Sequence, residues 1–144
     1  MGRSYNRRMK APTSIKLHRK SRVLDLEYAD GTRYALPCEY LRVYSPSAEV
    51  RGHGGGEPAI VPGKRKVAIE RVEPVGNYAV RLVFDDGHNT GLYSWDVLED
   101  LAVHHEPYWA RYLERLGEHG LTRDSAVTKL SALTPAPQKW RPPG

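Results

Sequence analysis

The sequence predicts an α+β fold with two layers, in which a mostly antiparallel sheet packs against short helical turns and a C-terminal helix. Three observations support this class. Apolar and polar residues alternate in short segments between residues 13 and 93, as they do in strands with one buried face. The pairs Asp30-Gly31 and Asp86-Gly87 are typical of tight hairpin turns, because glycine readily adopts positive φ. A later segment repeats its apolar residues with the period of a helix.

The first half of the predicted sheet contains three strands. Residues 15–17 supply the apolar positions of the first strand, and residues 23–28 supply those of the second. The third strand covers residues 33–36 and ends at Pro37, which has no backbone N–H to donate. A single helical turn is expected over residues 39–44.

The second half repeats this order. Strands are expected over residues 67–72, 78–84 and 88–92, and the hydroxyl of Ser94 is suited to cap a helical turn at residues 95–101. Apolar residues around the second Asp-Gly pair have counterparts 56 positions earlier around the first. This spacing indicates a duplicated unit of one hairpin and one helical turn.

The remaining segments complete a single domain. An amphipathic helix is predicted over residues 107–118, with Gly120 at its C-terminal end. We assign residues 13–125 to the domain, residues 1–12 to a disordered basic leader and residues 126–144 to a flexible, Pro-rich tail. The side chains expected in or near the core are Tyr28, Tyr34, Leu36, Val80, Leu82, Phe84, Leu92, Trp95, Leu98, Trp109 and Leu113.

Composition restricts the class of protein. The 144 residues are enough for one domain. No apolar run approaches the ~20 residues that a membrane-spanning helix needs, and residues 1–22 lack the hydrophobic stretch of a secretory signal. Cys38 is the single cysteine, so an intrachain disulfide is excluded. We therefore expect a cytoplasmic protein with no membrane partner.

The net charge of +5 is concentrated at the N-terminus. Residues 1–23 hold eight basic and no acidic side chains, and the other 14 basic and 17 acidic residues give the rest of the chain a net charge of −3. A basic arm of this kind can bind an anion or nucleic acid by neutralising phosphates. A solvated leader explains the same pattern, and no series of aromatic residues accompanies the charges to stack on bases.

Three motifs between residues 12 and 101 are those of a known family. They are Asp30-Gly31-x-x-Tyr34-x-Leu36-Pro37, Tyr40-Leu41-Arg42 and Asp86-Gly87-His88-x-x-x-Leu92-Tyr93-Ser94-Trp95-Asp96-x-Leu98. With these motifs the segment resembles the N-terminal domain of γ-butyrobetaine hydroxylase and trimethyllysine hydroxylase, and the whole chain resembles the stand-alone bacterial type of this DUF971 family. The same domain occurs at the C-terminal end of some P-loop iron–sulfur carrier ATPases, which implies a protein partner in iron–sulfur assembly.

The resemblance implies that the matching domain of the hydroxylases is a zinc module with three cysteines and one histidine as ligands. The cysteine positions correspond to Ser45, Ser47 and Val50 in this chain, and the histidine corresponds to His88. Structural zinc needs four ligands, and neither serine nor valine is a normal one. The resemblance therefore implies a zinc module that has lost its metal and has kept one histidine.

A different mononuclear iron or zinc site that uses His88 is an alternative. The other side chains that could contribute ligands are Cys38, His53, Glu57, His104 and His105. A structural role competes with this interpretation at each position. Cys38 is suited to a small buried site at a strand end, and His88 to a turn in which it bonds to the backbone.

No catalytic constellation is visible. The H-x-D/E pair of an iron oxygenase does not follow His53 or His88, and the glycine run at residues 52–56 lacks the G-x-x-x-x-G-K-S/T pattern of a phosphate loop. We expect a non-catalytic interaction or accessory domain that binds a protein partner or forms a homodimer. The alternatives are metal binding through His88 and, with less support, anion or nucleic-acid binding through the basic leader.

Overall fold

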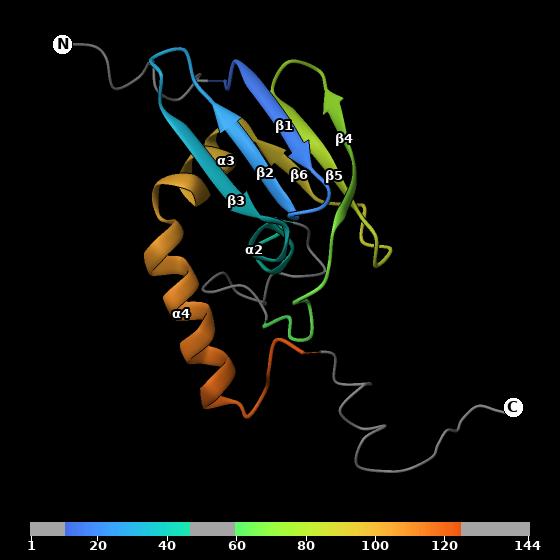
Figure 1. Ribbon diagram of the computed structural model, residues 1–144, viewed down its shortest axis with the longest axis vertical. Helices are drawn as coiled ribbons and strands as arrows, with labels where there is room; N and C mark the ends of the chain where they lie inside the picture. The colour runs from blue at the N-terminus through green and yellow to red at the C-terminus, as the bar shows by residue number, and fades with distance from the viewer. Residues whose placement is uncertain (1–10, 47–59, 125–144) are drawn as a thin grey trace, which may run out of the picture.

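The strands form two antiparallel sheets that share one core (Figure 1). The computed structural model describes residues 11–46 and 60–124. The first sheet contains β1 (Ser14–His18), β2 (Val23–Glu27) and β3 (Arg33–Pro37), and the second contains β4 (Ile69–Val75), β5 (Ala79–Phe84) and β6 (Leu92–Ser94). The α+β class is confirmed, and the strands are divided between two three-stranded sheets where the sequence analysis placed them in one.

Several predictions concern residues outside the described ranges. These predictions concern the leader up to residue 10, the tail at residues 126–144, and the candidate ligand positions Ser47, Val50, His53 and Glu57. Among the described residues, no helix is both long enough and apolar enough to cross a lipid bilayer.

Each sheet is followed by a helix. The short α2 (Cys38–Val43) follows β3, and α3 (Trp95–Val103) follows β6. The Ser94 hydroxyl accepts a hydrogen bond from the N–H of Val97 at 3.2 Å, as the sequence predicted for this N-cap. The two halves of the domain therefore have the same order of three strands and one helix.

The two Asp-Gly turns are alike down to their hydrogen bonds. In the first turn the N–H of Tyr28 donates to the Thr32 carbonyl at 2.9 Å, and in the second the N–H of Phe84 donates to the His88 carbonyl at 3.0 Å. In each turn the aspartate side chain accepts the N–H of the residue two positions later. The glycines have φ values of 89° and 93°, which other residues rarely adopt. The structure thus confirms the repeated hairpin, and each repeat also contains the third strand that the sequence predicts.

A one-residue shift distinguishes the second hairpin from the first. Leu24 pairs with Leu36 in the first hairpin, whereas its counterpart Val80 pairs with Tyr93. Because neighbouring residues of a strand face opposite sides, Tyr93 enters the core and Leu92 is 44% exposed. The prediction that Leu92 belongs to the core is therefore wrong.

The last helix, α4 (His105–Glu118), runs beside α2 and the ends of the sheets (Figure 1). It begins two residues before the predicted start and ends in a Schellman motif, in which Leu121 N–H donates to the Leu116 carbonyl at 2.9 Å and Gly120 has a φ of 67°. Tyr112 and Leu116 are buried against α2, while Leu113 is 41% exposed. The prediction of a buried Leu113 is wrong, because the helix turns the face that carries Tyr112 and Leu116 towards the domain.

Candidate site around His88 and Ser45

His88 directly follows the second Asp-Gly turn and is buried, with 5% of its surface exposed. Its backbone is fixed on both sides, because its N–H donates to the Asp86 carboxylate at 3.1 Å and its carbonyl accepts the N–H of Phe84. The imidazole lies against the Phe84 ring with a centroid distance of 6.0 Å. The turn therefore holds this histidine in the interior of the domain.

Ser45 comes from the other repeat, two residues after α2, and is completely buried. Its hydroxyl oxygen lies 3.0 Å from Nε2 of His88. Gly91 makes room for this pair, because a Cβ at that position would lie 2.5 Å from the Ser45 oxygen. Ser45 and His88, two of the positions that the resemblance relates to zinc ligands, are thus neighbours.

The tyrosine that the register shift brings into the core extends this contact. The Tyr93 hydroxyl donates to the Leu41 carbonyl at 2.6 Å. Burial raises the pKa of Tyr93, and a hydrogen bond with Ser45 opposes that rise. His88, Ser45 and Tyr93 therefore form one buried polar network that links the second turn to α2.

A charged group borders this network. The Asp86 carboxylate accepts hydrogen bonds from Nε of Arg42 at 2.9 Å and from Nζ of Lys64 at 2.6 Å. Burial alone would raise the pKa of Asp86, but the hydrogen bonds from Lys64, the His88 N–H and Arg42 lower it to about 2. Nη1 of Arg42 is buried and has no hydrogen-bond partner among the described residues. Asp86 is thus a carboxylate that remains ionised and ties three segments together.

The described part of this site does not fit the family's zinc centre. One imidazole and one hydroxyl face each other, and a neutral serine hydroxyl is a poor ligand for zinc. Across residues 11–46 and 60–124, no group of three or more His, Cys, Asp or Glu side chains is placed to hold a metal ion. The arrangement is suited to joining two segments of the chain.

The other predicted ligands within the described ranges lie apart from His88. Cys38 is completely buried at the start of α2, and burial raises the pKa of its thiol. The rings of His104 and His105 diverge. His104 stacks on Tyr108 at 5.2 Å, and His105 packs on Tyr40 at 4.5 Å. Each of these side chains has a structural role.

Sequence reasoning missed three members of the site. Arg42 and Tyr93 lie within the family motifs, which indicate the resemblance but no role in this site, and Lys64 lies outside those motifs. The turn motif explained Asp86 but did not indicate its ion pairs with Arg42 and Lys64. A signal for Tyr93 was available, because its aromatic ring follows Leu92 directly and a shift of one residue exchanges their faces.

Comparison with known proteins agrees with these motifs. The family model described as "Gamma-butyrobetaine hydroxylase-like, N-terminal" matches residues 15–99, which include both Ser45 and His88. The chain belongs to this gamma-butyrobetaine hydroxylase-like N-terminal family. No curated protein matches the chain.

Three solved structures are similar to this family member over most of its length. Two are NMR solution structures with 52% and 47% sequence identity and TM-scores of 0.71 and 0.70. Each match covers 81% of this chain, and they cover 86% and 91% of the respective relatives. The third is a crystal structure from Acidithiobacillus ferrooxidans of a DUF971 protein with unknown function. It is 41% identical, has a TM-score of 0.55, and the match covers 67% of this chain and 96% of that one.

Proposed function

We propose that this domain is a non-catalytic interaction module that binds another protein. The hydrogen bond between His88 and Ser45 is the observation that supports this proposal most strongly. A catalytic base or a metal ligand needs a ring nitrogen that can reach substrate or ion. Here Nε2 of the buried imidazole is engaged with a side chain of the same domain, and the nearby carboxylate of Asp86 is engaged with two cations.

The class of partner comes from the family. Because the domain resembles one that is fused to P-loop iron–sulfur carrier ATPases, we propose a cytoplasmic partner that assembles or delivers iron–sulfur clusters. Fusion in some proteins and separate chains in others is a common arrangement for domains that act together.

Binding to a purified P-loop iron–sulfur carrier ATPase tests this proposal. We expect isothermal titration calorimetry with the full chain to give a saturable binding isotherm with a defined stoichiometry. A heat-unfolded sample of the chain serves as the control. Absence of binding to the ATPase, together with no specific protein recovered by affinity purification from cells, would overturn the proposed function.

A mononuclear iron or zinc site that uses His88 is the second candidate. The observation that favours it is the 3.0 Å contact between Ser45 and His88, which places two positions related to family ligands side by side. Elemental analysis of protein purified without a histidine tag distinguishes the two candidates. Stoichiometric iron or zinc that is lost in His88→Ala would support the metal site, and protein without metal would exclude it.

A further inference from the structure

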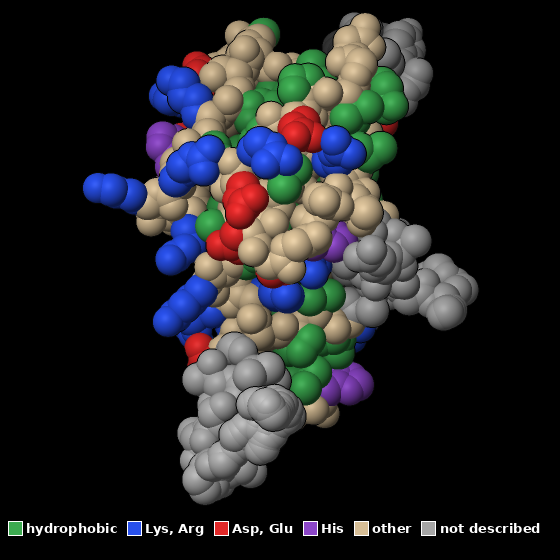
Figure 2. All heavy atoms as spheres, turned by 90° about the vertical axis from the view of Figure 1, so that its right-hand side faces the viewer, with side chains coloured by type: hydrophobic (Ala, Val, Ile, Leu, Met, Phe, Trp, Pro, Cys, Tyr) green, Lys and Arg blue, Asp and Glu red, His purple; other side chains and the backbone are tan. Residues whose placement is uncertain are grey.

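The turn that joins β1 to β2 presents three positive charges and no negative one. Its residues are Arg19, Lys20, Ser21 and Arg22, and all of them are exposed. None of the three cations forms an ion pair with another residue of the described ranges. The turn adjoins β4, and Figure 2 shows that Lys and Arg side chains gather on the side of the molecule where β4 lies.

Two hydrogen bonds hold this segment, which we call the 19–22 turn, against the domain. The N–H of Cys38 donates to the Arg22 carbonyl at 2.9 Å, and Nη2 of Arg19 donates to the Glu70 carbonyl at 2.8 Å. Because Arg19 bonds to a carbonyl, this contact does not neutralise its charge. The turn is thus fixed between the starts of α2 and β4 (Figure 1), and a fixed surface loses less entropy when a partner binds.

The backbone of Arg22 is strained. Its φ is 57°, and it is the one residue other than glycine with a positive φ in the described part of the chain. A side chain raises the energy of this left-handed conformation, whereas glycine adopts it readily. The fold itself would therefore accept glycine at this position. An exposed arginine kept in a strained conformation indicates a role for its charge outside the domain.

The opposite charge is found on another element. The helix α3, which packs beside β3, carries Asp96, Glu99 and Asp100 and no basic residue. The positive 19–22 turn and this negative helix give the domain an uneven distribution of charge. Such a distribution attracts an acidic surface towards the turn and repels it from α3.

We propose that the 19–22 turn is the surface on which this domain binds an acidic patch of its protein partner. The guanidinium groups of Arg19 and Arg22 are suited to carboxylates, which they can bind with two parallel hydrogen bonds. Lys20 adds a third charge between them. This inference rests on the proposed function of an interaction module, and it names the surface and the chemistry of the partner.

Nucleic acid fits the 19–22 turn less well. Single strands are bound by aromatic rings that stack on the bases, and the one exposed Tyr, Trp or Phe side chain among the described residues is Tyr78. It follows the far end of the seven-residue strand β4 and is therefore distant from Glu70, which Arg19 contacts. Duplexes are bound through a series of phosphate contacts, whereas these three charges lie on a single turn.

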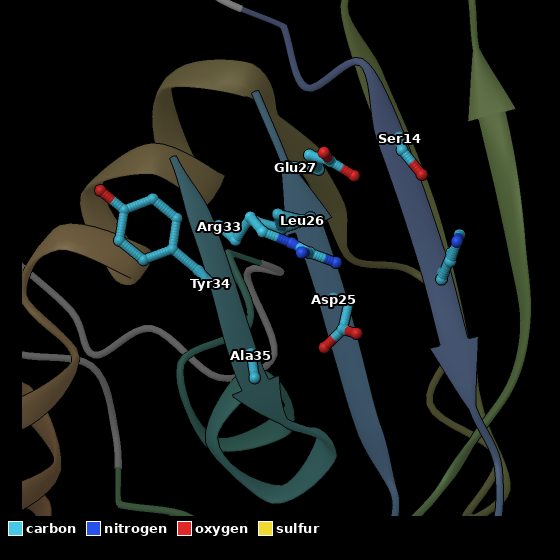
Figure 3. A pocket seen from close by; sticks show the side chains of 8 residues that line it. Ser14, Asp25, Leu26, Glu27, Arg33, Tyr34 and Ala35 are labelled. Carbon is cyan, nitrogen blue, oxygen red and sulfur yellow. The ribbon is translucent and has the colours of Figure 1, made fainter. Parts of the chain in front are cut away.

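The hollow on the outer face of the first sheet is a weaker candidate surface (Figure 3). Residues of all three strands line it, and its charged members are Lys16, Asp25, Glu27 and Arg33. Asp25 already pairs with His18 at 2.7 Å. A surface with two cations and two carboxylates does not select a partner of one charge, and the 19–22 turn does.

Isothermal titration calorimetry of the full chain with the purified P-loop iron–sulfur carrier ATPase tests which surface is used. Lys20→Ser/Arg22→Gly removes two charges from the turn and should weaken binding by about tenfold or more. Arg7→Ser/Arg8→Ser removes two charges from the leader and is the matched control. The leader joins the opposite end of β1, about 15 Å away, so the control should bind within about threefold of the wild type.

The glycine in the test variant separates a loss of binding from a loss of folding. Because glycine adopts the conformation of Arg22 without steric cost, Lys20→Ser/Arg22→Gly should unfold at the wild-type temperature or above it. Thermal unfolding followed by circular dichroism measures this temperature. If the double variant is not folded, Lys20→Glu replaces it and should weaken binding in the same direction.

Two simple polymers test the chemistry without the ATPase. We expect the wild type to bind poly-L-glutamate and Lys20→Ser/Arg22→Gly to bind it about fivefold or more weakly. Binding should also weaken by about fivefold or more between about 50 mM and about 500 mM NaCl. A short DNA duplex is the second polymer, and its binding should not depend on the turn.

The outcomes separate this inference from the proposed function. Equal binding of the ATPase by the wild type and by Lys20→Ser/Arg22→Gly would overturn the inference and leave the proposed function standing. No binding of the ATPase, with poly-L-glutamate still bound through the turn, would remove the named partner and support the acidic-patch site. DNA bound more tightly than poly-L-glutamate, and lost in the turn variant, would overturn the inference in favour of nucleic acid.

Discussion

The hydroxyl of Ser45 and Nε2 of His88 are 3.0 Å apart and join the two halves of the domain. Ser45 belongs to the segment after α2, and His88 belongs to the turn between β5 and β6. Both side chains are buried, so water does not readily replace the bond between them. The contact therefore contributes to the stability of the domain.

Replacing Ser45 by alanine tests that contribution. The change removes the hydrogen bond to a buried ring nitrogen, which costs about 1–3 kcal/mol. Urea unfolding of Ser45→Ala should show a decrease of this size in the free energy of unfolding. Thr32 occupies the position in the first turn that His88 occupies in the second. Thr32→Ala is therefore the control, and it should lower the free energy of unfolding by less than about 0.5 kcal/mol. Equal losses in both variants would contradict a specific role for the pair.

Restoring the cysteines should restore metal binding. The variant Ser45→Cys/Ser47→Cys/Val50→Cys would present three thiolates with His88, the four ligands of a tetrahedral zinc site. We expect one zinc ion per chain by elemental analysis, and its loss when His88→Ala is added. A triple variant that is folded but binds no zinc would refute the correspondence of these positions with the family ligands.

Gly91 and Gly117 form a matched pair of glycine substitutions. A Cβ at Gly91 would lie 2.5 Å from the Ser45 oxygen and 3.1 Å from the Tyr93 ring, whereas a Cβ at Gly117 would meet nothing within 4 Å. Gly91→Ala should therefore destabilise the domain by about 1–3 kcal/mol. Gly117→Ala, on the exposed side of α4, should stabilise it by about 0.5–1 kcal/mol. Thermal unfolding measures both changes, and a shift of the same sign in both would be inconsistent with this packing.

The low pKa of Asp86 predicts a specific loss of stability in acid. Because the pKa of Asp86 is about 2 in the folded state and the ordinary value for an aspartate is 3.8, the folded state favours the ionised carboxylate. Its contribution is present above the unfolded pKa and is lost as the pH falls towards 2. The change amounts to about 1–2 kcal/mol. Urea unfolding of Asp86→Asn between about pH 5 and about pH 2 should lack this component of the pH dependence, and a curve parallel to the wild type would disprove it.

The ion pair between Glu39 and Arg123 should be important for the C-terminal segment. The guanidinium donates to both carboxylate oxygens at 2.9 and 2.7 Å, and it lies 5.2 Å from the centre of the Trp109 ring. Glu39 is only 6% exposed, so Arg123→Met leaves a buried charge and should cost about 3 kcal/mol. Glu39→Gln/Arg123→Met should recover part of this loss. If the double variant is as unstable as Arg123→Met alone, the loss of stability comes from the contact between Arg123 and Trp109.

The sequence-based predictions that the structure confirms depend on local patterns of residues. The Asp-Gly turns and the Ser94 cap depend on residues close together in the chain, and the structure confirms both. The exposure of Leu92 depends on the register of the whole second hairpin, and the local pattern alone did not decide whether Leu92 or Tyr93 faces the core. Glu39 and Arg123 are 84 positions apart in the chain, and no periodic pattern in the sequence indicates that they form an ion pair.

At the candidate site, the motifs identified the neighbours Ser45 and His88 through the family resemblance. They did not indicate that the hydroxyl would bond to the imidazole or that Tyr93 would join them. Those contacts arise from the way the two sheets pack, which is information that a single sequence does not contain.

The repeated halves carry this site only once, and helix length explains the asymmetry. In the first half α2 has six residues, and the chain leaves it in time for Ser45 to meet the second turn. In the second half α3 has nine residues and continues through the matching position, while the first turn carries Thr32 in place of histidine. The two halves therefore share their order of strands and helix but not this contact, because Leu101 inside α3 stands where Ser45 would be and Thr32 stands where His88 would be.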